Sequence, residues 1–250
     1  RLQPGDGKAA GFRPARGRRK EPRALARGGS MRKDYSVKAV IFDMDGVITN
    51  TMPDHFHAWK EILKTEGISV TRHDIYSREG QRGINSVFEL FETYKRPVTD
   101  ARAHKILKRK EELFKRIVRI RFITGSRRFL RRLHQQKFKL ALVTGTSRQE
   151  LHRILPQPLY DLFDVVVTGS DVMNGKPHPE PYLKAVRQLS LRCRDAVAIE
   201  NAPFGIRSAK AAGLRCLALE TSLSTEYLKQ ADRIFKTFKE MEAQINFCRN

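Results

Sequence analysis

Cysteine is scarce in this 250-residue chain, which has only Cys193, Cys216 and Cys248 and no Cys-x-x-Cys pair. Because the three positions are scattered, the sequence indicates neither a disulfide framework nor a zinc ribbon. A chain of this length buries roughly 70% or more of its unfolded surface, so its core needs no such cross-link. We therefore expect a reducing compartment and a cytoplasmic protein.

Long hydrophobic runs are also missing, since no window holds 18 consecutive apolar residues. This excludes a membrane-spanning helix, and we expect no membrane partner. Acidic residues are few: 27 Asp and Glu stand against 49 Lys and Arg, which gives a formal net charge of +22. Such a charge is compatible with nucleic acid, an anionic surface or small phosphorylated substrates.

Residues 1–30 hold nine Lys or Arg and two acidic residues among Gly, Pro and Ala. They contain almost no large apolar side chain, so they cannot build a core. They also lack the apolar stretch of a secretory signal. We interpret residues 1–35 as a disordered basic arm, or as translated upstream sequence, because Met31 stands directly before the first segment with a folded pattern.

Short apolar runs recur from Val37 onward, as in strands that are buried on both faces of a sheet. Segments with helical spacing lie between the later runs, at residues 181–189 and 204–212. Alternating strands and helices predict an α/β fold, a doubly wound parallel sheet with helices on both faces. The predicted strands lie at residues 37–42, 140–144, 165–168, 196–200 and 216–219.

The first two predicted strands are separated by far more residues than one crossover helix needs. Helical spacing recurs in the interval, over residues 53–66, 84–94 and 100–119. We infer an α-helical cap at residues 56–122, inserted into an α/β core made of residues 36–55 and 123–250. Ligands of open α/β sheets bind beyond the carboxyl ends of the strands, so a cap there would act as a lid.

Two carboxylates, Asp43 and Asp45, follow the first predicted strand. A pair of acids at a strand end arises easily by chance, because Asp is common in turns. Further polar groups, however, follow later strands: Thr144-Gly145-Thr146, Lys176-Pro177 and Glu200-Asn201. Since the carboxyl ends of parallel strands meet at one edge of a sheet, we expect these groups in one crevice.

Together these residues resemble the motifs of the haloacid dehalogenase superfamily, in order and in position on the strands. The likeness covers about residues 36–247 and is closest to the helical-cap branch of beta-phosphoglucomutase-like phosphatases. The resemblance implies a magnesium-dependent phosphotransferase that acts through an aspartyl phosphate. It implies that Asp43 is the nucleophile, and that Asp45 is first the general acid and then the general base. Halide leaves without a proton, so Asp45 favours a phosphate substrate.

The resemblance also assigns the phosphate-binding groups. The Thr144 hydroxyl and the backbone N–H groups of Gly145 and Thr146 would bind the transferring phosphate, with Gly46 beside them. Lys176 would neutralise charge on the phosphoryl oxygens and on Asp43. A threonine that only caps the next helix remains a compatible alternative for this loop. A lone Lys in a loop is usually just solvated, so its role depends on the neighbouring motifs.

Mg²⁺ would be held by Asp43, Asp45, Glu200 and Asn201, because a small hard cation prefers carboxylate and water oxygens. Asn201 departs from the branch, which commonly has Asp there. The neutral amide removes one negative charge, so we expect catalysis with weaker metal affinity. Alternatively, Asn201 caps the helix that follows Pro203.

The cap is expected to set the substrate. His55 resembles a branch residue that positions the acid/base Asp, although an exposed helix His is an equal alternative. A mutase would hold a second phosphate with a basic pair on the cap loop, where this chain has Glu79 and Gly83. Arg82 or Arg148 would have to substitute. We therefore favour hydrolysis of a small phosphorylated metabolite over beta-phosphoglucomutase-type transfer.

Basic side chains crowd residues 102–132. Among them, Lys110 resembles a lysine of the mutase that faces the active site. This density supports an alternative of another class, a polyanion-binding or nucleic-acid-binding protein whose catalytic site is secondary. Aromatic residues are not interleaved with the basic ones as a surface for stacking single strands requires. Nucleic acid is thus the less favoured partner, and we expect a monomer.

Overall fold

The computed structural model describes residues 32–249. Within that range the main sheet has six parallel strands in the order β4-β3-β2-β5-β6-β7. Every residue of the central strands β2 (Ala39–Phe42) and β5 (Ala196–Glu200) is buried, which explains their unbroken apolar runs. The predicted α/β class is confirmed. The outer strands are β3 (Lys139–Val143), β4 (Val165–Val167), β6 (Arg215–Leu219) and β7 (Arg233–Phe235).

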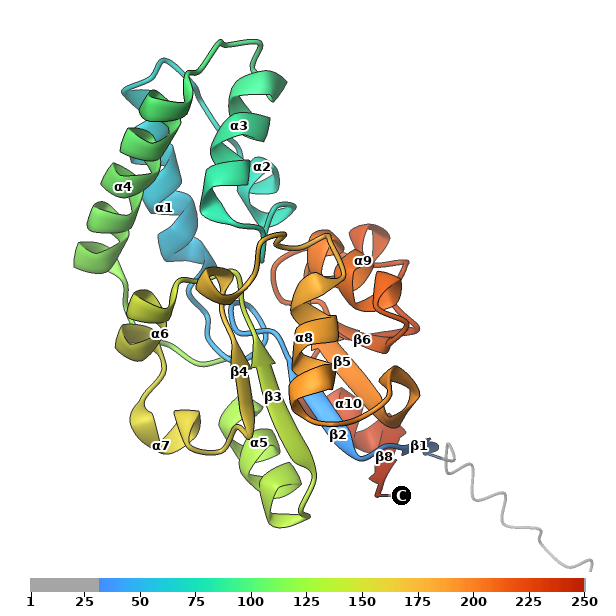
Figure 1. Cartoon of the computed structure of the whole chain (residues 1–250). Coiled ribbons are helices and arrows are strands. Elements are labelled where there is room, and N and C mark those ends of the chain that lie inside the picture. Colours follow the sequence, from blue (N-terminus) through green and yellow to red (C-terminus); the bar gives the residue numbers. More distant parts are fainter. Residues whose placement is uncertain (1–31, 250) are drawn as a thin grey trace, which may run out of the picture. The chain divides into compact units, whose positions relative to one another are not determined.

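Helices cover both faces of this sheet (Figure 1). One face packs against α8 (Glu180–Gln188) and α9 (Pro203–Ala211), through an apolar cluster that includes Tyr182 and Ile206. The opposite face packs against α5 (Ser126–Gln135) and α10 (Phe238–Gln244). The short helices α6 (Arg148–Ile154) and α7 (Gln157–Tyr160) contribute apolar side chains to the cluster that α5 and α10 form with this face. Single 3₁₀ turns occur at Gly169–Asp171, Cys193–Asp195 and Thr225–Tyr227.

A second, two-stranded parallel sheet joins β1 (Lys33–Ser36) to β8 (Ile245–Cys248). Tyr35 of β1 is buried and its ring lies 6.2 Å from that of Phe247. The predicted disordered arm is therefore wrong for residues 33–35, and its residues 1–31 lie outside the described range. A four-residue strand with one apolar side chain leaves no periodic signal, and its partner lies at the opposite end of the described chain.

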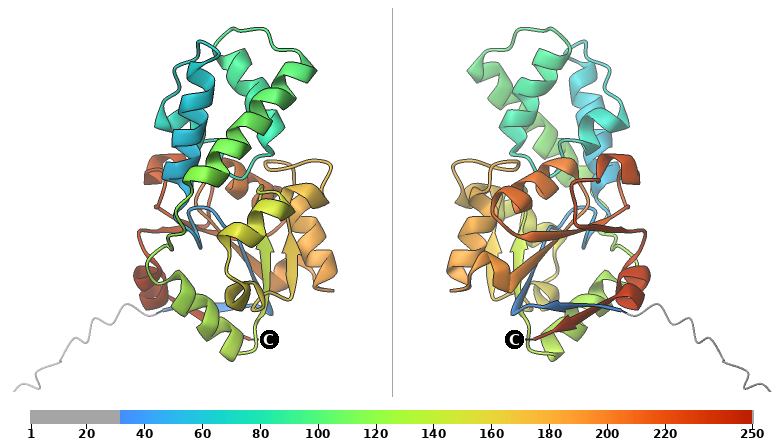
Figure 2. Two further views of the ribbon diagram at one scale, coloured as in Figure 1. Left: turned by 90° about the vertical axis from the view of Figure 1, so that its left-hand side faces the viewer. Right: turned by 90° about the vertical axis from the view of Figure 1, so that its right-hand side faces the viewer.

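Four helices, which we call the cap, stand beyond the carboxyl ends of the main sheet (Figure 2). They share an apolar cluster of their own that contains Trp59, Leu63, Leu90 and Ile106. The first begins before residue 56, so the exact limits of a cap domain remain a prediction. No helix in the described range is long and apolar enough to cross a bilayer. The cap comprises α1 (Met52–Lys64), α2 (Arg72–Tyr76), α3 (Gly83–Thr93) and α4 (Asp100–Ile117).

Replacing Phe129 with Ala tests the packing of α5 on the sheet. Phe129 is 0% exposed, and its ring lies 6.1 Å from that of Phe42 and 4.9 Å from that of Phe238. We expect Phe129→Ala to lower the free energy of unfolding by about 3–5 kcal/mol, measured by urea denaturation. Phe88 is 36% exposed, so Phe88→Ala should cost less than about 0.5 kcal/mol. Equal losses in the two variants would contradict this packing.

Candidate active site

A buried ammonium group joins three strand ends. Asp43 follows β2, and its N–H donates to the Ile199 carbonyl at 3.0 Å. Lys176 Nζ donates to Asp43 Oδ1 and to Glu200 Oε1, at 2.6 Å each. It also donates to the carbonyl oxygen of Val143 at 3.2 Å. The three charged side chains are at most 2% exposed, so their contacts form in a water-poor interior.

Burial shapes the electrostatics of this group. Loss of solvent raises the pKa of Asp43 to about 8, with the Lys176 ammonium acting against the rise and Glu200 adding to it. Burial also acts against the charge of Lys176, but the carboxylates of Asp43 and Glu200 prevail and raise its pKa. Asp43 Oδ2 accepts no hydrogen bond from the residues described. One oxygen of Asp43 is thus fixed by Lys176, and the other is uncommitted.

Glu200 is held by a contact that sequence reasoning missed. The Tyr182 hydroxyl donates to Glu200 Oε1 at 2.6 Å, and the Asn201 N–H donates to Oε2 at 3.0 Å. Tyr182 lies on the apolar stripe of α8, and the spacing of that stripe identifies a core residue. Nothing in the spacing shows where its hydroxyl points.

Asp45 accepts hydrogen bonds from three threonine hydroxyls. Thr146 Oγ1 donates to Oδ2 at 3.1 Å, whereas Thr49 and Thr51 donate to Oδ1. Thr51 precedes α1 but does not cap it, because its side chain turns to Asp45. Burial raises the pKa of Asp45, while the three hydroxyls act against the rise. The carboxyl group is therefore held in one orientation beside Asp43.

His55 lies between Asp45 and a cap lysine. His55 Nε2 is 3.9 Å from Asp45 Oδ1, and Lys110 Nζ is 3.0 Å from His55 Nδ1. Burial, helped by Lys110, holds the pKa of His55 well below its usual value. An ammonium can only donate, so Nδ1 accepts and the ring proton lies on Nε2, toward Asp45. His55 also stacks on Phe114, with the ring centroids 3.9 Å apart, so it is not the exposed helix residue considered above.

The loop after β3 lies beside these acids. The Thr146 N–H donates to Thr144 Oγ1 at 3.1 Å, which leaves the Thr144 hydroxyl proton free to point elsewhere. Gly46 makes the turn after Asp45 with φ of +80°, where an L side chain is strained. Its N–H already donates to the Thr49 carbonyl at 2.7 Å. Gly46 thus shapes the turn without offering a free donor to phosphate.

A cavity of about 250 Å³ lies between the cap and these strand ends. Core residues of its wall include Asp45, Gly145 and Thr146, and cap residues include His55 and Lys110. This volume is close to the lower end of the range of pockets that hold small molecules.

The family model of haloacid dehalogenase-like hydrolases matches residues 40–219. The chain belongs to this family. The predicted family and the enzyme class of a phosphoric monoester hydrolase are thereby confirmed.

Relatives of this hydrolase include two curated proteins. A phosphorylated carbohydrates phosphatase of Thermotoga maritima is 32% identical over 71% of this chain and 82% of its own length. A beta-phosphoglucomutase of Bacillus subtilis is 31% identical over 71% of this chain and 81% of its own. Among solved structures, CbbY from Rhodobacter sphaeroides in complex with phosphate matches with a TM-score of 0.70 and 25% identity. That match covers 83% of this chain and 99% of CbbY.

The two arginines considered as substitutes for a basic pair are engaged within the hydrolase. Arg82 lines the cavity, but its Nη1 donates to the Met173 carbonyl at 2.6 Å. Arg148 Nη2 donates to Asp171 Oδ2 at 2.6 Å, and Arg148 does not line the cavity. Of the predicted phosphate-binding groups, the Arg148 side chain is directed to Asp171, and the N–H groups of Gly46 and Thr146 already donate within the chain.

Asn201 does not cap the helix that follows it, so that alternative is wrong. Ala202 is the N-cap residue of α9, and Asn201 Nδ2 donates instead to Ser222 Oγ at 3.0 Å. Asn201 Oδ1 is buried and accepts no hydrogen bond from the described part of the chain.

Glu79 is a site residue that sequence reasoning did not assign. It lies in the loop between α2 and α3 and is 5% exposed, and neither of its oxygens accepts a hydrogen bond within residues 32–249. Burial, and then the charge of Asp43, raise its pKa well above the usual value. The sequence identified only the absence of a basic residue at this position. A buried carboxylate could not be inferred from it.

The side chains present fit a hard divalent cation. Every uncommitted buried atom of Asp43, Glu79 and Asn201 is an oxygen, as Mg²⁺ prefers. Within the described residues no three His, Cys, Asp or Glu side chains are arranged to hold an ion by themselves. Asp43 Oδ1 and Glu200 Oε1 instead accept hydrogen bonds from Lys176 Nζ. A cation would therefore draw on the amide oxygen and on water as well.

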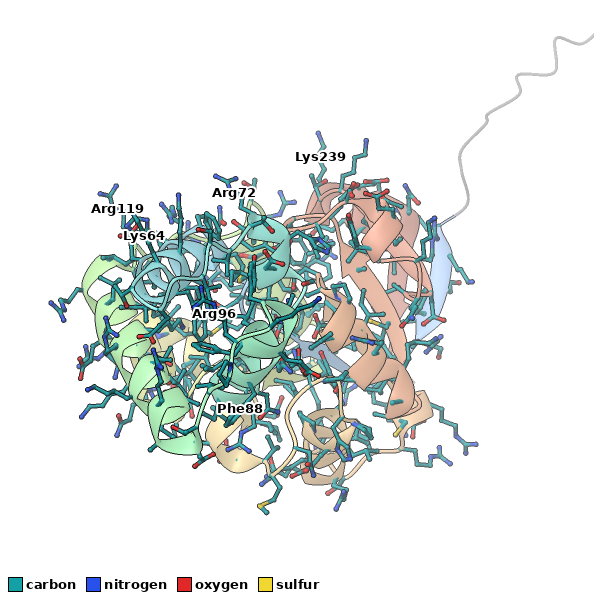
Figure 3. All side chains as sticks on the ribbon, turned by 90° about the horizontal axis from the view of Figure 1, so that it is seen from above. Lys64, Arg72, Phe88, Arg96, Arg119 and Lys239 are labelled. Carbon is teal, nitrogen blue, oxygen red and sulfur yellow. The ribbon has the colours of Figure 1, made fainter. Side chains whose placement is uncertain are left out.

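A minority of the basic side chains form ion pairs. Arg102 and Arg109 both contact Glu66, and Arg121 contacts Asp54. Other basic side chains, such as Arg72 and Arg119, extend outward (Figure 3). Basic side chains on the surface create a field that attracts anions in general.

Exchanging Lys176 for Met tests the buried ion group. Asp43 and Glu200 would keep their burial without a counter-charge, so we expect the free energy of unfolding to fall by about 3–5 kcal/mol. The half-exposed pair of Lys210 and Asp232, 2.6 Å apart, provides the control. Lys210→Met should cost at most about 1 kcal/mol. Chemical denaturation measures both, and a small loss in both variants would argue against the charged state described here.

Proposed function

We propose that this hydrolase removes phosphate from a small phosphomonoester, a sugar phosphate or a related metabolite. The reaction would use Mg²⁺ and proceed through an aspartyl phosphate on Asp43. The observation that carries the proposal is the pairing of Lys176 with Asp43 Oδ1, which leaves Oδ2 without a hydrogen bond from the described residues. Asp45, two residues further along the chain, lines a cavity of small-molecule size. The phosphatase relative from Thermotoga maritima supports the same substrate class.

In the first step an Asp43 carboxylate oxygen attacks phosphorus, and the bond from phosphorus to the ester oxygen breaks. Asp45 gives its proton to the departing alcohol oxygen. In the second step Asp45 takes a proton from water, which attacks phosphorus and releases Asp43 and inorganic phosphate. The buried environment that raises the pKa of Asp45 suits a group that must first carry a proton.

Other groups orient and compensate charge. Lys176 stays protonated and offsets the negative charge near Asp43. The Thr144 hydroxyl and the Gly145 N–H would bind the phosphoryl oxygens, whereas the Thr146 N–H already donates to Thr144 Oγ1. Neutral His55, supported by Lys110, would keep Asp45 in place.

Asp43, Asp45, Glu200 and Asn201 would hold Mg²⁺ at this site. When bound, the cation would neutralise charge on the transferring phosphoryl group and on the surrounding carboxylates. Its proposed presence also accounts for the uncommitted buried oxygens of Asp43 and Asn201, which protein donors do not satisfy.

A phosphosugar mutase is the second candidate, since a curated relative from Bacillus subtilis is a beta-phosphoglucomutase. A mutase must retain a bisphosphate intermediate while the sugar turns over. This chain has Glu79 and Gly83 at the expected basic positions, and both Arg82 and Arg148 are bound to protein oxygens. These features favour hydrolysis.

The nucleophile is tested with Asp43→Asn, which keeps the size of the side chain. We expect phosphate release from a panel of sugar phosphates and nucleoside monophosphates to fall by about 10³-fold or more. Unaltered protein should lose its turnover in EDTA and regain it with Mg²⁺. A melting temperature near that of the unaltered chain would show that the variant is folded. Full activity in Asp43→Asn would refute the covalent route.

An assay with glucose 1-phosphate and a trace of glucose bisphosphate distinguishes hydrolysis from the mutase reaction. Because the cap loop lacks the basic pair, we expect free phosphate to accumulate faster than glucose 6-phosphate. A coupled dehydrogenase assay for glucose 6-phosphate and a colorimetric assay for phosphate measure the two products. Faster formation of glucose 6-phosphate would make the mutase the better assignment.

A further inference from the structure

Glu79 is a buried carboxylate in need of a partner. Its side chain belongs to the cap, yet only 5% of the residue is exposed, and neither oxygen accepts a hydrogen bond of normal geometry among residues 32–249. The neutral Asn201 amide is the polar group beside it. An ionised carboxylate in such a place costs several kcal/mol unless an opposite charge compensates it. The cationic side chains nearby are committed elsewhere, since Lys176 contacts Asp43 and Glu200 and Lys110 contacts His55.

The backbone directs Glu79 into the core site. A Cβ placed on Gly46 would lie 2.8 Å from Glu79 Oε1 and 2.8 Å from Asn201 Cγ, so both side chains meet above this turn. The next residue, Gly80, has φ of +78°, and a Cβ there would lie 2.7 Å from Lys176 Cδ. The cap loop is therefore pressed against the core, and the position of Glu79 is a consequence of that close contact.

Asn201 supplies the complementary observation. It stands at the end of β5, where a carboxylate would add charge to a cation site, but it carries none. Its Nδ2 is bound to Ser222, and its Oδ1 is buried without a donor in the described chain. One carboxylate is thus missing from the strand end, and one unexplained carboxylate arrives from the cap at the same turn.

We propose that Glu79 supplies a carboxylate to the divalent-cation site of the core, in place of the charge that Asn201 lacks. The cation then joins cap to core, either by direct contact with Glu79 or through a bound water, since Mg²⁺ usually retains several waters. This inference rests on the proposed Mg²⁺ dependence.

The cation should consequently favour the closed arrangement of the cap. A ligand shifts a conformational equilibrium by its difference in affinity for the two states. With the cap open, Glu79 leaves the site and the cation keeps only its core contacts. With the cap closed it gains a further carboxylate, so cation binding and protection of the loop at residues 77–83 are coupled.

The test compares Glu79→Gln with Glu92→Gln in the full chain, without substrate. Glu92 lies on α3 and is exposed, so its variant controls for loss of a cap carboxylate. Titration calorimetry with Mg²⁺ or Mn²⁺ should show about tenfold or greater weakening in Glu79→Gln. Glu92→Gln should stay within about twofold of the unaltered chain. Adding Asn201→Asp to Glu79→Gln should restore much of the lost affinity, because it returns a carboxylate to the site.

Hydrogen exchange provides the second readout. Mg²⁺ should protect the amides of residues 77–83 in the unaltered chain and in Glu92→Gln, but not in Glu79→Gln. The substitution removes an uncompensated buried charge, so the variant should fold, which its melting temperature without cation checks. Unchanged cation affinity in Glu79→Gln overturns the inference while leaving the proposed phosphatase intact. Absence of cation binding by the unaltered chain overturns both.

Discussion

The Lys176 ammonium lies between two buried carboxylates, and the geometry of the site depends on that contact. It fixes Asp43 at the end of β2 and Glu200 at the end of β5, and it also reaches the carbonyl at the end of β3. Burying a charge is costly without close partners, so the three strands cannot shift independently near this point. Asp43 Oδ2 accepts no hydrogen bond from the described residues, as the proposed role of Asp43 as nucleophile requires.

Much of this arrangement follows from the sequence. Strands buried on both faces appear as apolar runs, and polar residues directly after them must emerge at one edge of a parallel sheet. Asp43, Thr144 and Glu200 could therefore be placed together before any coordinates. Lys176 could be assigned to the site only together with the other motifs. It lies several residues after β4, and a single lysine in a loop has no distinctive sequence pattern.

Other features depend on contacts between distant segments and leave no local signal. The strands β1 and β8 pair across nearly the whole described chain, and each is too short to show a period. The Tyr182 hydroxyl and the Thr51 side chain are directed by packing to Glu200 and Asp45. The position of Arg148 in the sequence made it a candidate for binding phosphate, but in the structure its guanidinium group donates to Asp171. Burial of a polar group is a property of the assembled chain.

The cap loop connects specificity to electrostatics. A basic residue at position 79 would attract a second phosphate and would also repel a cation at the core. Glu79 cannot supply that positive charge, and its carboxyl group lies beside Asn201. Under the two proposals above, the residue that would weaken a mutase reaction is also the one that would compensate for the neutral amide at the end of β5. On this view one residue of the cap sets both the strength of the cation site and the preference for water as the phosphoryl acceptor.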